Sequence, residues 1–408
     1  MTAPTPAASP RLSLPYRLFD ADTHYYEPDD CFTRHIEARF KDQTVWIDRR
    51  AAGPGKMYVG RERCHFFSVG AGDSVGPPGI MKAFLRGDSE EGGNPSLQPI
   101  NALAVPEFVA RDARLAVMDA QGVEACLILP TAGVGVEPQL RETPAVLYPS
   151  LRAYNRWLEE DWGYGADGRL YGAPLLSLLD LDAALAELER VLARGARFVI
   201  LTAGPIAGRS PADPHFDPFW ARCAEAGVGV IYHIGRTPFS EMYNPPWGLR
   251  PHPPSHRHSL MEWALSFTER PVVDTITALI ADNLFGRHPA LRVLSIEYGS
   301  SWVAPLLHKL DHLARLFSKD MWRFGPPPLT PSDTFRRHVW VSPFFEDDMV
   351  ALAHLIGPTH VLGGSDYPHP EGLLWPIELV DELAGLPAAD VRAIMRDNLA
   401  GLIAPRET

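Results

Sequence analysis

The chain has 408 residues, which allows two or three domains of about 150 residues or one large α/β barrel with insertions. Hydrophobic residues make up 46% and charged residues 22%, a balance that excludes a disordered chain, and 40 prolines with 33 glycines indicate many rigid turns. The net charge of −12 without a basic run excludes a typical nucleic-acid binder, and the absence of an apolar run of roughly 18 residues argues against a membrane span.

In chain order, residues 1–15 (MTAPTPAASPRLSLP) predict a disordered tail, and a first strand is expected at 17–22. Residues 28–105 contain many glycines and prolines with little periodicity, so we expect a long insertion that covers the catalytic face. From about residue 107, short β-rich runs alternate with helical patterns. The strands expected there are 124–130, 170–176, 197–202, 228–233, 291–297, 338–342 and 359–363. Eight strands, most followed by a helix, predict a single (β/α)₈ TIM barrel over residues 16–408.

The segment after the fifth strand, 242–258 (MYNPPWGLRPHPPSHRH), is too rich in proline for a helix or a central strand. Loops after barrel strands lie on the catalytic face, so this loop either shapes a substrate pocket or is a passive crossover. Trp247 and His252 are candidate walls for a mostly apolar small molecule. Arg236, also after the fifth strand, is a candidate clamp for a carboxylate.

Polar residues are concentrated where the predicted strands end. The first strand leads into Asp22 and His24, the fifth ends in His233, the sixth in Glu297, and the eighth leads into Asp366. In a barrel these ends surround one axis, and carboxylates brought together there without a cation would repel one another. Two imidazoles and two or three carboxylates suit a divalent ion such as zinc, manganese or iron.

Each of these features also has a structural interpretation when taken alone. A single Asp-x-His can cap a strand end, His233 can be a core histidine, and Glu297 can pair with an arginine. The glycine and proline run around Asp366 can be an ordinary turn. Their joint occurrence at the ends of strands one, five, six and eight favours a metal site, because core and capping roles would not select that face.

The motifs from FDADTHYYEP at residue 19 to MRDNLAGL at residue 395, with HVLGGSDYPHPEG between them, resemble the amidohydrolase-2 branch of the amidohydrolase superfamily. That branch includes aminocarboxymuconate-semialdehyde decarboxylase and resorcylate-type decarboxylases. The resemblance implies that Asp22 and His24 stand for the first-strand His-x-His ligands, His233 for the fifth-strand ligand and Asp366 for the aspartate that touches metal and metal-bound water. It also shows a departure, since Glu297 occupies the sixth-strand position where the decarboxylases often have histidine.

The resemblance further implies one divalent ion, for which we expect zinc, with manganese or iron as alternatives. The five lysines are Lys41, Lys56, Lys82, Lys309 and Lys319, so none lies near the end of the fourth strand at 197–202. A carbamylated lysine bridging two metals is therefore not expected. A second ion, held by Glu297 with Asp22, Asp366 or a loop histidine, is not required by the sequence.

Two reactions fit these ligands. In hydrolysis, which we favour from the sequence, Asp366 accepts a proton from metal-activated water that attacks an amide, ester, lactone or thioester, and Glu297 or His369 protonates the leaving group. In the alternative, decarboxylation, Asp366 or Glu297 protonates the carbon that loses carbon dioxide. A third hypothesis, from a different class, is a barrel that binds a ligand without turnover.

The cysteines, the first residues and one predicted helix indicate the cellular location and the candidate partners of the protein. Cys31, Cys64, Cys126 and Cys223 have no metal-ligand or framework spacing, which is typical of free thiols in a reducing compartment, and the first residues lack an apolar signal core. We therefore expect an enzyme that is located in the cytoplasm and acts on a small-molecule substrate. The helix predicted at 306–317 has an apolar stripe that fits either the barrel or the partner of a homodimer.

Overall fold

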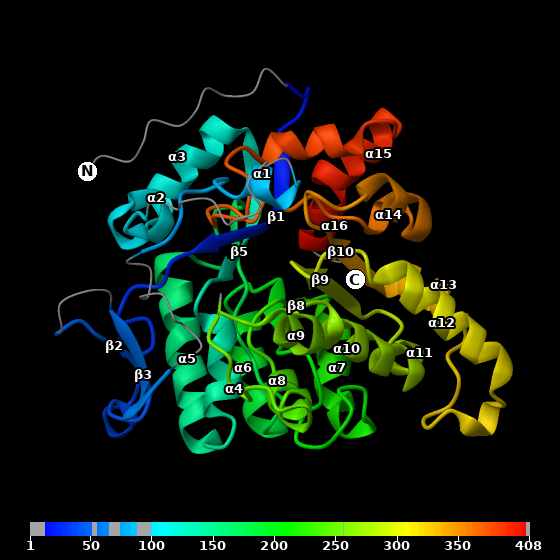
Figure 1. Cartoon of the computed structure of the whole chain (residues 1–408), viewed down its shortest axis with the longest axis horizontal. Coiled ribbons are helices and arrows are strands. Elements are labelled where there is room, and N and C mark those ends of the chain that lie inside the picture. The colour runs from blue at the N-terminus through cyan, green and yellow to red at the C-terminus, as the bar shows by residue number, and fades with distance from the viewer. Residues whose placement is uncertain (1–12, 51–54, 65–73, 88–98, 256, 405–408) are drawn as a thin grey trace.

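A ring of parallel strands lies at the centre of the molecule with helices around it (Figure 1). The computed structural model describes residues 13–50, 55–64, 74–87, 99–255 and 257–404. The parallel strands are β1 (Leu18–Tyr25), β5 (Val123–Pro130), β6 (Leu170–Gly172), β7 (Phe198–Ile200), β8 (Gly229–His233), β9 (Arg292–Ile296) and β10 (Val339–Ser342). Seven of the eight predicted strands are therefore present, with ends shifted by a few residues.

The strands form two parallel sheets, β1-β5-β6 and β7-β8-β9-β10, and single bridges join them. Leu175 pairs with Ile200 between β6 and β7. On the other side, the segment 361–367 closes the ring, because Val361 pairs with Val341 of β10 and Tyr367 pairs with Thr23 of β1. The predicted TIM barrel is confirmed.

The eighth strand differs from its prediction at 359–363. Pro358–His360 forms a 3₁₀ turn instead, and the segment after it makes single bridges and individual hydrogen bonds such as Ala21 N–H to Gly363 O (2.9 Å). Gly364 explains part of this irregularity, because a Cβ there would lie 2.6 Å from the Asp22 Cβ and 2.4 Å from the Ser342 Oγ. The missing side chain lets this segment approach β1 closely, where two predicted site residues emerge.

Amphipathic helices cover the outside of the ring. The longer ones are α3 (Arg111–Gln121), α5 (Pro144–Asp161), α6 (Leu181–Leu192), α7 (Asp217–Ala226), α10 (Arg270–Ala281), α12 (Val303–Leu316), α13 (Pro331–His338) and α14 (Met349–Ile356). The shorter ones are α1 (Lys82–Leu85), α2 (Pro106–Val109), α4 (Val136–Leu140), α8 (Phe239–Tyr243), α9 (Leu260–Glu262), α11 (Leu284–Arg287), α15 (Ala388–Arg392) and α16 (Asn398–Ile403). Local signals set their ends: the Asp180 side chain accepts from Ala183 N–H at the start of α6, and Gly122 ends α3 at φ 73°.

The described parts of the predicted 28–105 insertion include a small antiparallel sheet, β2 (Val45–Asp48), β3 (Lys56–Val59) and β4 (Glu62–Arg63), which Figure 1 shows beside α5. Another part contacts the chain after the eighth strand position, since Met81 N–H donates to Pro370 O (3.0 Å). Most of the predicted 1–15 tail, residues 1–12, and the segments 51–54, 65–73 and 88–98 lie outside the described residues.

The loop after β8 contains more helix than the proline content predicts. α8 extends to Tyr243, and Pro245–Trp247 forms a 3₁₀ turn before Gly248 at φ 72°. Both adjacent prolines stand within the first two positions of that turn, where a missing N–H costs no hydrogen bond. Proline therefore starts a short helical turn here rather than preventing one.

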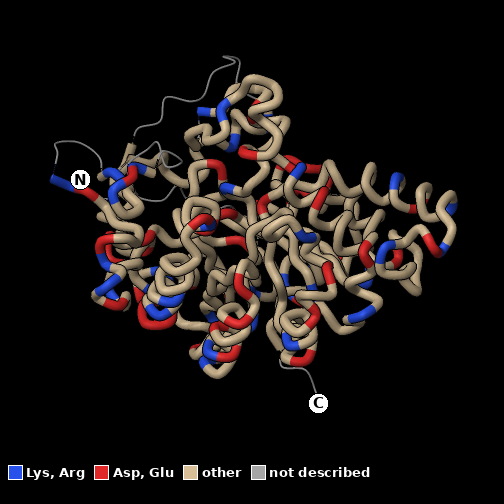
Figure 2. Tube along the Cα trace, turned by 90° about the horizontal axis from the view of Figure 1, so that it is seen from below, with Lys and Arg blue, Asp and Glu red and all other residues tan. Residues whose placement is uncertain are grey.

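The core lies between the ring and its helices, where Trp157, Trp162 and Trp220 are fully buried. Figure 2 shows positive and negative residues interspersed over the trace rather than gathered on one face. Among the described residues, no helix has the length and apolar composition that crossing a bilayer requires.

Candidate active site

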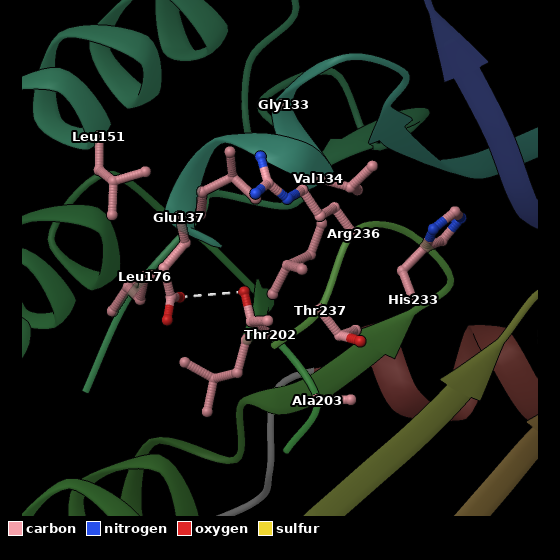
Figure 3. Close-up of a pocket in the computed structure, with 13 residues that line it drawn as sticks. Gly133, Val134, Glu137, Leu151, Leu176, Thr202, Ala203, His233, Arg236 and Thr237 are labelled. Carbon is pink, nitrogen blue, oxygen red and sulfur yellow. Dashed lines mark hydrogen bonds between the residues drawn. The ribbon is translucent and has the colours of Figure 1, made fainter. Parts of the chain in front are cut away.

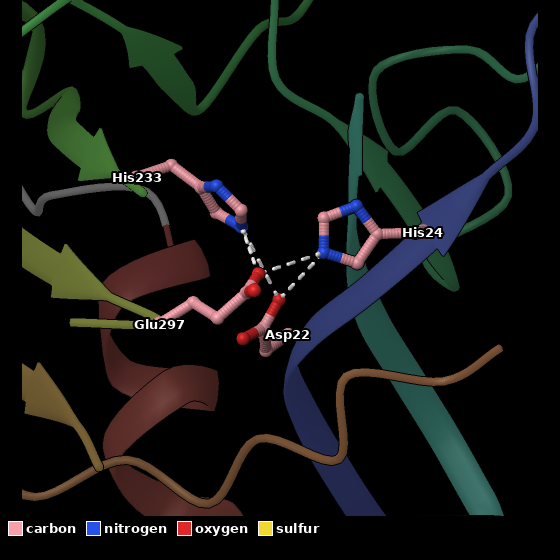
Figure 4. Close-up of side chains that lie close together, drawn as sticks. All are labelled: Asp22, His24, His233 and Glu297. Carbon is pink, nitrogen blue, oxygen red and sulfur yellow. Dashed lines mark hydrogen bonds and ion pairs between the residues drawn. The ribbon is translucent and has the colours of Figure 1, made fainter. Parts of the chain in front are cut away.

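Four side chains converge at the carboxyl ends of three strands (Figure 4). Asp22 and His24 come from β1, His233 ends β8, and Glu297 follows β9. His24 Nε2 lies 3.1 Å from Asp22 Oδ1, and His233 Nε2 lies 3.0 Å from Glu297 Oε2. One nitrogen or oxygen atom from each residue lies within 4.8 Å of those of the other three. The structure thus brings together three of the four residues predicted to share one ion, together with Glu297.

Asp366, the fourth predicted residue, belongs to a second group that overlaps the first. His24, Glu297, Asp366 and His369 also present ligand atoms within 4.8 Å of one another. Asp366 Oδ1 lies 3.4 Å from His24 Nε2 and 2.7 Å from His369 Nδ1. The His369 ring stacks on His24 at 4.0 Å between centroids. Since both groups share His24 and Glu297, they form one polar centre.

Hydrogen bonds to the backbone orient both imidazoles. Nδ1 of His24 lies 3.1 Å from Pro130 O, and Nδ1 of His233 lies 2.8 Å from Ile234 O. A carbonyl only accepts, so each Nδ1 carries a proton and each Nε2 is the nitrogen that faces the centre of the group, where loss of its own proton would free it to bind a cation. This is the orientation that metal-binding histidines show in proteins.

The donor set fits a divalent cation. His233 Nε2, Glu297 Oε2 and Asp366 Oδ1 are buried, and among the described residues they lie within ion-pair distance of other site groups without forming a well-aligned hydrogen bond. Burial lowers the pKa of His233, but the carboxylates of Glu297 and Asp22 outweigh it and raise that pKa to about 10. Burial, together with the charge of Glu297, raises the pKa of Asp366 well above its ordinary value. The site thus needs added positive charge, either as protons or as a cation that two imidazoles and three carboxylates can bind.

Two of the acids sit on left-handed backbone. The φ angles are 60° at Glu297 and 56° at Asp366, values that residues other than glycine seldom adopt. Both positions follow the strand ends where the chain turns away from the barrel. Backbone of this kind costs on the order of 1–3 kcal/mol and is found mainly where function requires a fixed side-chain direction.

Buried polar residues behind the site hold these strand ends in place. Asp20 accepts hydrogen bonds from Ser365 N–H (2.9 Å) and Ser365 Oγ (2.5 Å), so it joins β1 to the segment that carries Asp366. Burial raises the Asp20 pKa to about 7. Arg114 of α3 is buried and donates to the carbonyl of His24 (2.6 Å). The sequence interpretation missed Arg114, because nothing in a surface-helix pattern distinguishes it from the exposed arginines.

A pocket opens beside the site and has His233 in its wall (Figure 3). Its empty volume is about 370 Å³, open solvent at its mouth included. Most of the lining is aliphatic, and the remaining residues include Thr202, Arg236 and Glu137. Glu137, in α4, was missed from the sequence. The strand-end rule, if applied to β5 as well, would have included the loop that leads to it.

The three predicted substrate-binding residues have different positions. Arg236 lines the pocket, but its guanidinium donates to Gln139, to Glu241 Oε1 (3.1 Å) and to His252 Nδ1 (3.0 Å). His252 therefore contacts Arg236 and is not part of the lining. Trp247 is 64% exposed in its 3₁₀ turn and does not line this pocket either. Trp247 and His252 therefore do not line this pocket, and their role in substrate binding stays a prediction.

Comparisons with known proteins identify the family of this chain. A family model described as amidohydrolase matches residues 20–400. An amidohydrolase structure from Mycobacterium avium subsp. paratuberculosis K-10 is 36% identical with a TM-score of 0.87, and the match covers 96% of this chain and 100% of that one. No curated protein gives a significant match.

More distant structures share the fold. A 5-carboxyvanillate decarboxylase from Sphingomonas paucimobilis is 17% identical with a TM-score of 0.61, over 96% of this chain and 99% of that one. A dihydroxybenzoic acid decarboxylase from Polaromonas sp. JS666, with bound manganese and the inhibitor 2-nitroresorcinol, is 17% identical with a TM-score of 0.54, over 79% and 92%. At this identity the likeness concerns the fold.

Proposed function

The chain belongs to the amidohydrolase family, in its amidohydrolase-2 branch, and from this premise we propose that it is a metal-dependent decarboxylase of a small carboxylic acid with an apolar body. The observation that carries the proposal is the position of a mostly aliphatic pocket directly beside the metal-ligand residues, with His233 belonging to both. We propose that a ring or short chain binds at this pocket with its carboxylate facing the polar centre. The decarboxylases that share the fold support this reaction over hydrolysis, which the sequence alone favoured.

We propose that Asp22, His24, His233 and Asp366 hold the metal, with Glu297 beside them. When bound, a divalent ion would neutralise the substrate carboxylate and its neighbouring oxygen. Three carboxylates and two imidazoles suit manganese as well as zinc, and manganese is the ion in the Polaromonas decarboxylase. We therefore propose manganese in place of the zinc expected from the sequence.

In the proposed mechanism the protein supplies a proton to carbon. Loss of carbon dioxide leaves an electron pair on the substrate carbon, and Asp366 donates the proton that completes the product. His369 Nδ1, 2.7 Å from Asp366 Oδ1, returns a proton to Asp366, and the Thr131 hydroxyl lies 3.0 Å from His369 Nε2. The aliphatic wall of the pocket limits the access of water, which would otherwise compete with the substrate carbon for the proton of Asp366.

Hydrolysis is the second candidate, and Glu297 favours it. Glu297 stands at the sixth-strand position, where the decarboxylases often have a histidine that acts as an acid or base. A glutamate at this position therefore does not reproduce the decarboxylase mechanism directly. In this alternative Asp366 accepts a proton from an attacking water, and Glu297 or His369 protonates the leaving group.

One experiment distinguishes the two reactions. The manganese-loaded enzyme is incubated with 2,6-dihydroxybenzoate, 5-carboxyvanillate and a panel of aryl esters and thioesters, in D₂O and in H₂¹⁸O. Decarboxylation predicts carbon dioxide and a product with deuterium at the vacated carbon. An acid product that carries ¹⁸O, without carbon dioxide, would instead establish hydrolysis, and no turnover of any compound would support a binding role.

A further inference from the structure

Glu137 is a buried carboxyl group that the proposed mechanism does not use. It lies in α4, one of the first elements after β5, and lines the pocket that His233 also lines. Figure 3 shows the two side chains on different sides of that pocket. Glu137 is only partly exposed, and its neighbours in the lining include Leu151, Leu176 and Ile200.

The protein satisfies this carboxyl group only in part. Thr202 Oγ donates to Glu137 Oε2 at 3.0 Å, and the Ser177 hydroxyl also bonds to it. Among the residues that the structure describes, Glu137 forms no ion pair. Arg236, the cation in the lining, is held by Gln139, Glu241 and His252. Among the described residues, no cation therefore forms an ion pair with this acceptor, although the charge of Arg141 at the end of α4 also acts on it.

Burying a carboxyl group in an aliphatic wall is costly unless a partner compensates it. Burial raises the pKa of Glu137 to about 7, although the hydrogen bond from Thr202, the charge of Arg141 and the hydrogen bond from Ser177 oppose this shift. An apolar residue would fill the position at lower cost, so a ligand group that bonds to Glu137 accounts for its presence.

We propose that Glu137 determines substrate specificity by accepting a hydrogen bond from a hydroxyl or amino group at the end of the substrate remote from its carboxylate. The acceptor stands across the pocket from the metal-ligand residues, so it selects molecules that carry an acid at one end and a donor at the other. A site that bonds to such a donor binds the analogue that lacks it less tightly, because the carboxylate then lacks the hydrogen bond that the donor supplies. This inference rests on the proposed function only in taking the pocket as the substrate site.

The test measures binding, so it does not depend on turnover. Isothermal titration of the full-length, manganese-loaded protein compares benzoates with a methyl, hydroxyl or aminomethyl group at position 3 or 4. The methyl compounds match the hydroxyl compounds in size but have no donor. Glu137→Leu removes the acceptor, Glu137→Gln keeps an acceptor oxygen without the charge, and Glu142→Gln is a control on an exposed glutamate just after α4.

We expect the unmodified protein and Glu142→Gln to bind at least one donor-bearing benzoate about 10- to 100-fold more tightly than its methyl counterpart. Glu137→Leu should abolish that preference. In Glu137→Gln, a retained preference for hydroxyl identifies a neutral donor, and loss of a preference for aminomethyl identifies an ammonium ion. Equal affinity for methyl and donor-bearing compounds, a preference that survives in Glu137→Leu, or no binding of any benzoate would overturn the proposal. If no carbon dioxide is released while the Glu137-dependent preference persists, the proposed reaction fails and this inference stands.

Discussion

Glu297 Oε2 lies 3.0 Å from His233 Nε2, where two neighbouring strands, β9 and β8, end side by side. Glu297 stands on left-handed backbone, with φ 60°, at the point where the chain leaves β9. Asp366 shows the same conformation at the eighth strand position. The two strained residues thus direct two carboxylates to one centre, and this explains why the site has a deficit of positive charge.

Replacing Asp366 by Asn is expected to reduce kcat by about 100-fold or more, because the amide has the shape of the carboxyl group but supplies no proton. The variant should remain folded, since Asp366 N–H still donates to Asp22 O. Steady-state kinetics test this on whichever compound of the panel in "Proposed function" is turned over, and thermal denaturation is the folding control. Turnover equal to that of the unmodified enzyme would remove Asp366 from the proton transfer.

Replacing Arg114 by Met is expected to lower the free energy of unfolding by about 2–4 kcal/mol, because the carbonyl of His24 and that of Glu107 lose a buried, charged donor. Metal affinity should fall as well, since His24 is no longer held at its strand end. Urea unfolding and metal titration measure the two effects. Replacing the exposed Arg39 by Met is the control, and an equal effect in both variants would contradict a specific role for Arg114.

The pH dependence of stability should reveal the buried Glu137. Its pKa, about 7 in the native state, is above the 4.5 of an ordinary glutamate, so the native state binds its proton more tightly than the unfolded state does. The free energy of unfolding therefore falls as the pH rises from about 4.5 through 7. This fall should be smaller in Glu137→Gln, by about 1–3 kcal/mol. Urea unfolding at pH 5 and pH 8 measures it, and Glu142→Gln should retain the full fall. Parallel changes in all three proteins would show that Glu137 titrates normally.

Removing the metal with a chelator should lower Tm by several degrees and abolish activity, because the uncompensated carboxylates then repel one another. Adding manganese should restore both quantities. Differential scanning calorimetry before and after dialysis follows the change. An unchanged Tm together with unchanged activity would mean that protons alone satisfy the site.

Much of the site could be predicted because the barrel converts short apolar runs into strands whose ends share one face. This rule located Asp22, His24, His233, Glu297 and Asp366 from their neighbours in the sequence alone. It placed His369 with them only through the motif around Asp366. The confirmed barrel supports this reasoning, since the positions follow from strand order and need no knowledge of the loops.

The remaining features depend on contacts that are distant in the sequence. Arg114 is recognisable only when α3 packs behind β1, and Glu137 only when four strand ends enclose a pocket. The eighth strand was misplaced because an apolar run suggested regular pairing, whereas Gly364 permits a close approach to Asp22 instead. The position of Trp247 outside the pocket lining could not be foreseen, because proline content does not indicate where a 3₁₀ turn directs its side chains.

We propose that one divalent ion binds between Asp22, His24, His233 and Asp366, with Glu297 beside it. Anomalous diffraction at the manganese edge, from crystals of the manganese-loaded protein, would locate this ion. We expect one anomalous peak at about 2.0–2.3 Å from the Nε2 atoms of His24 and His233 and from carboxylate oxygens of Asp22 and Asp366. If no peak lies in the barrel, or if residues outside this group bind the ion, the proposed metal site is wrong.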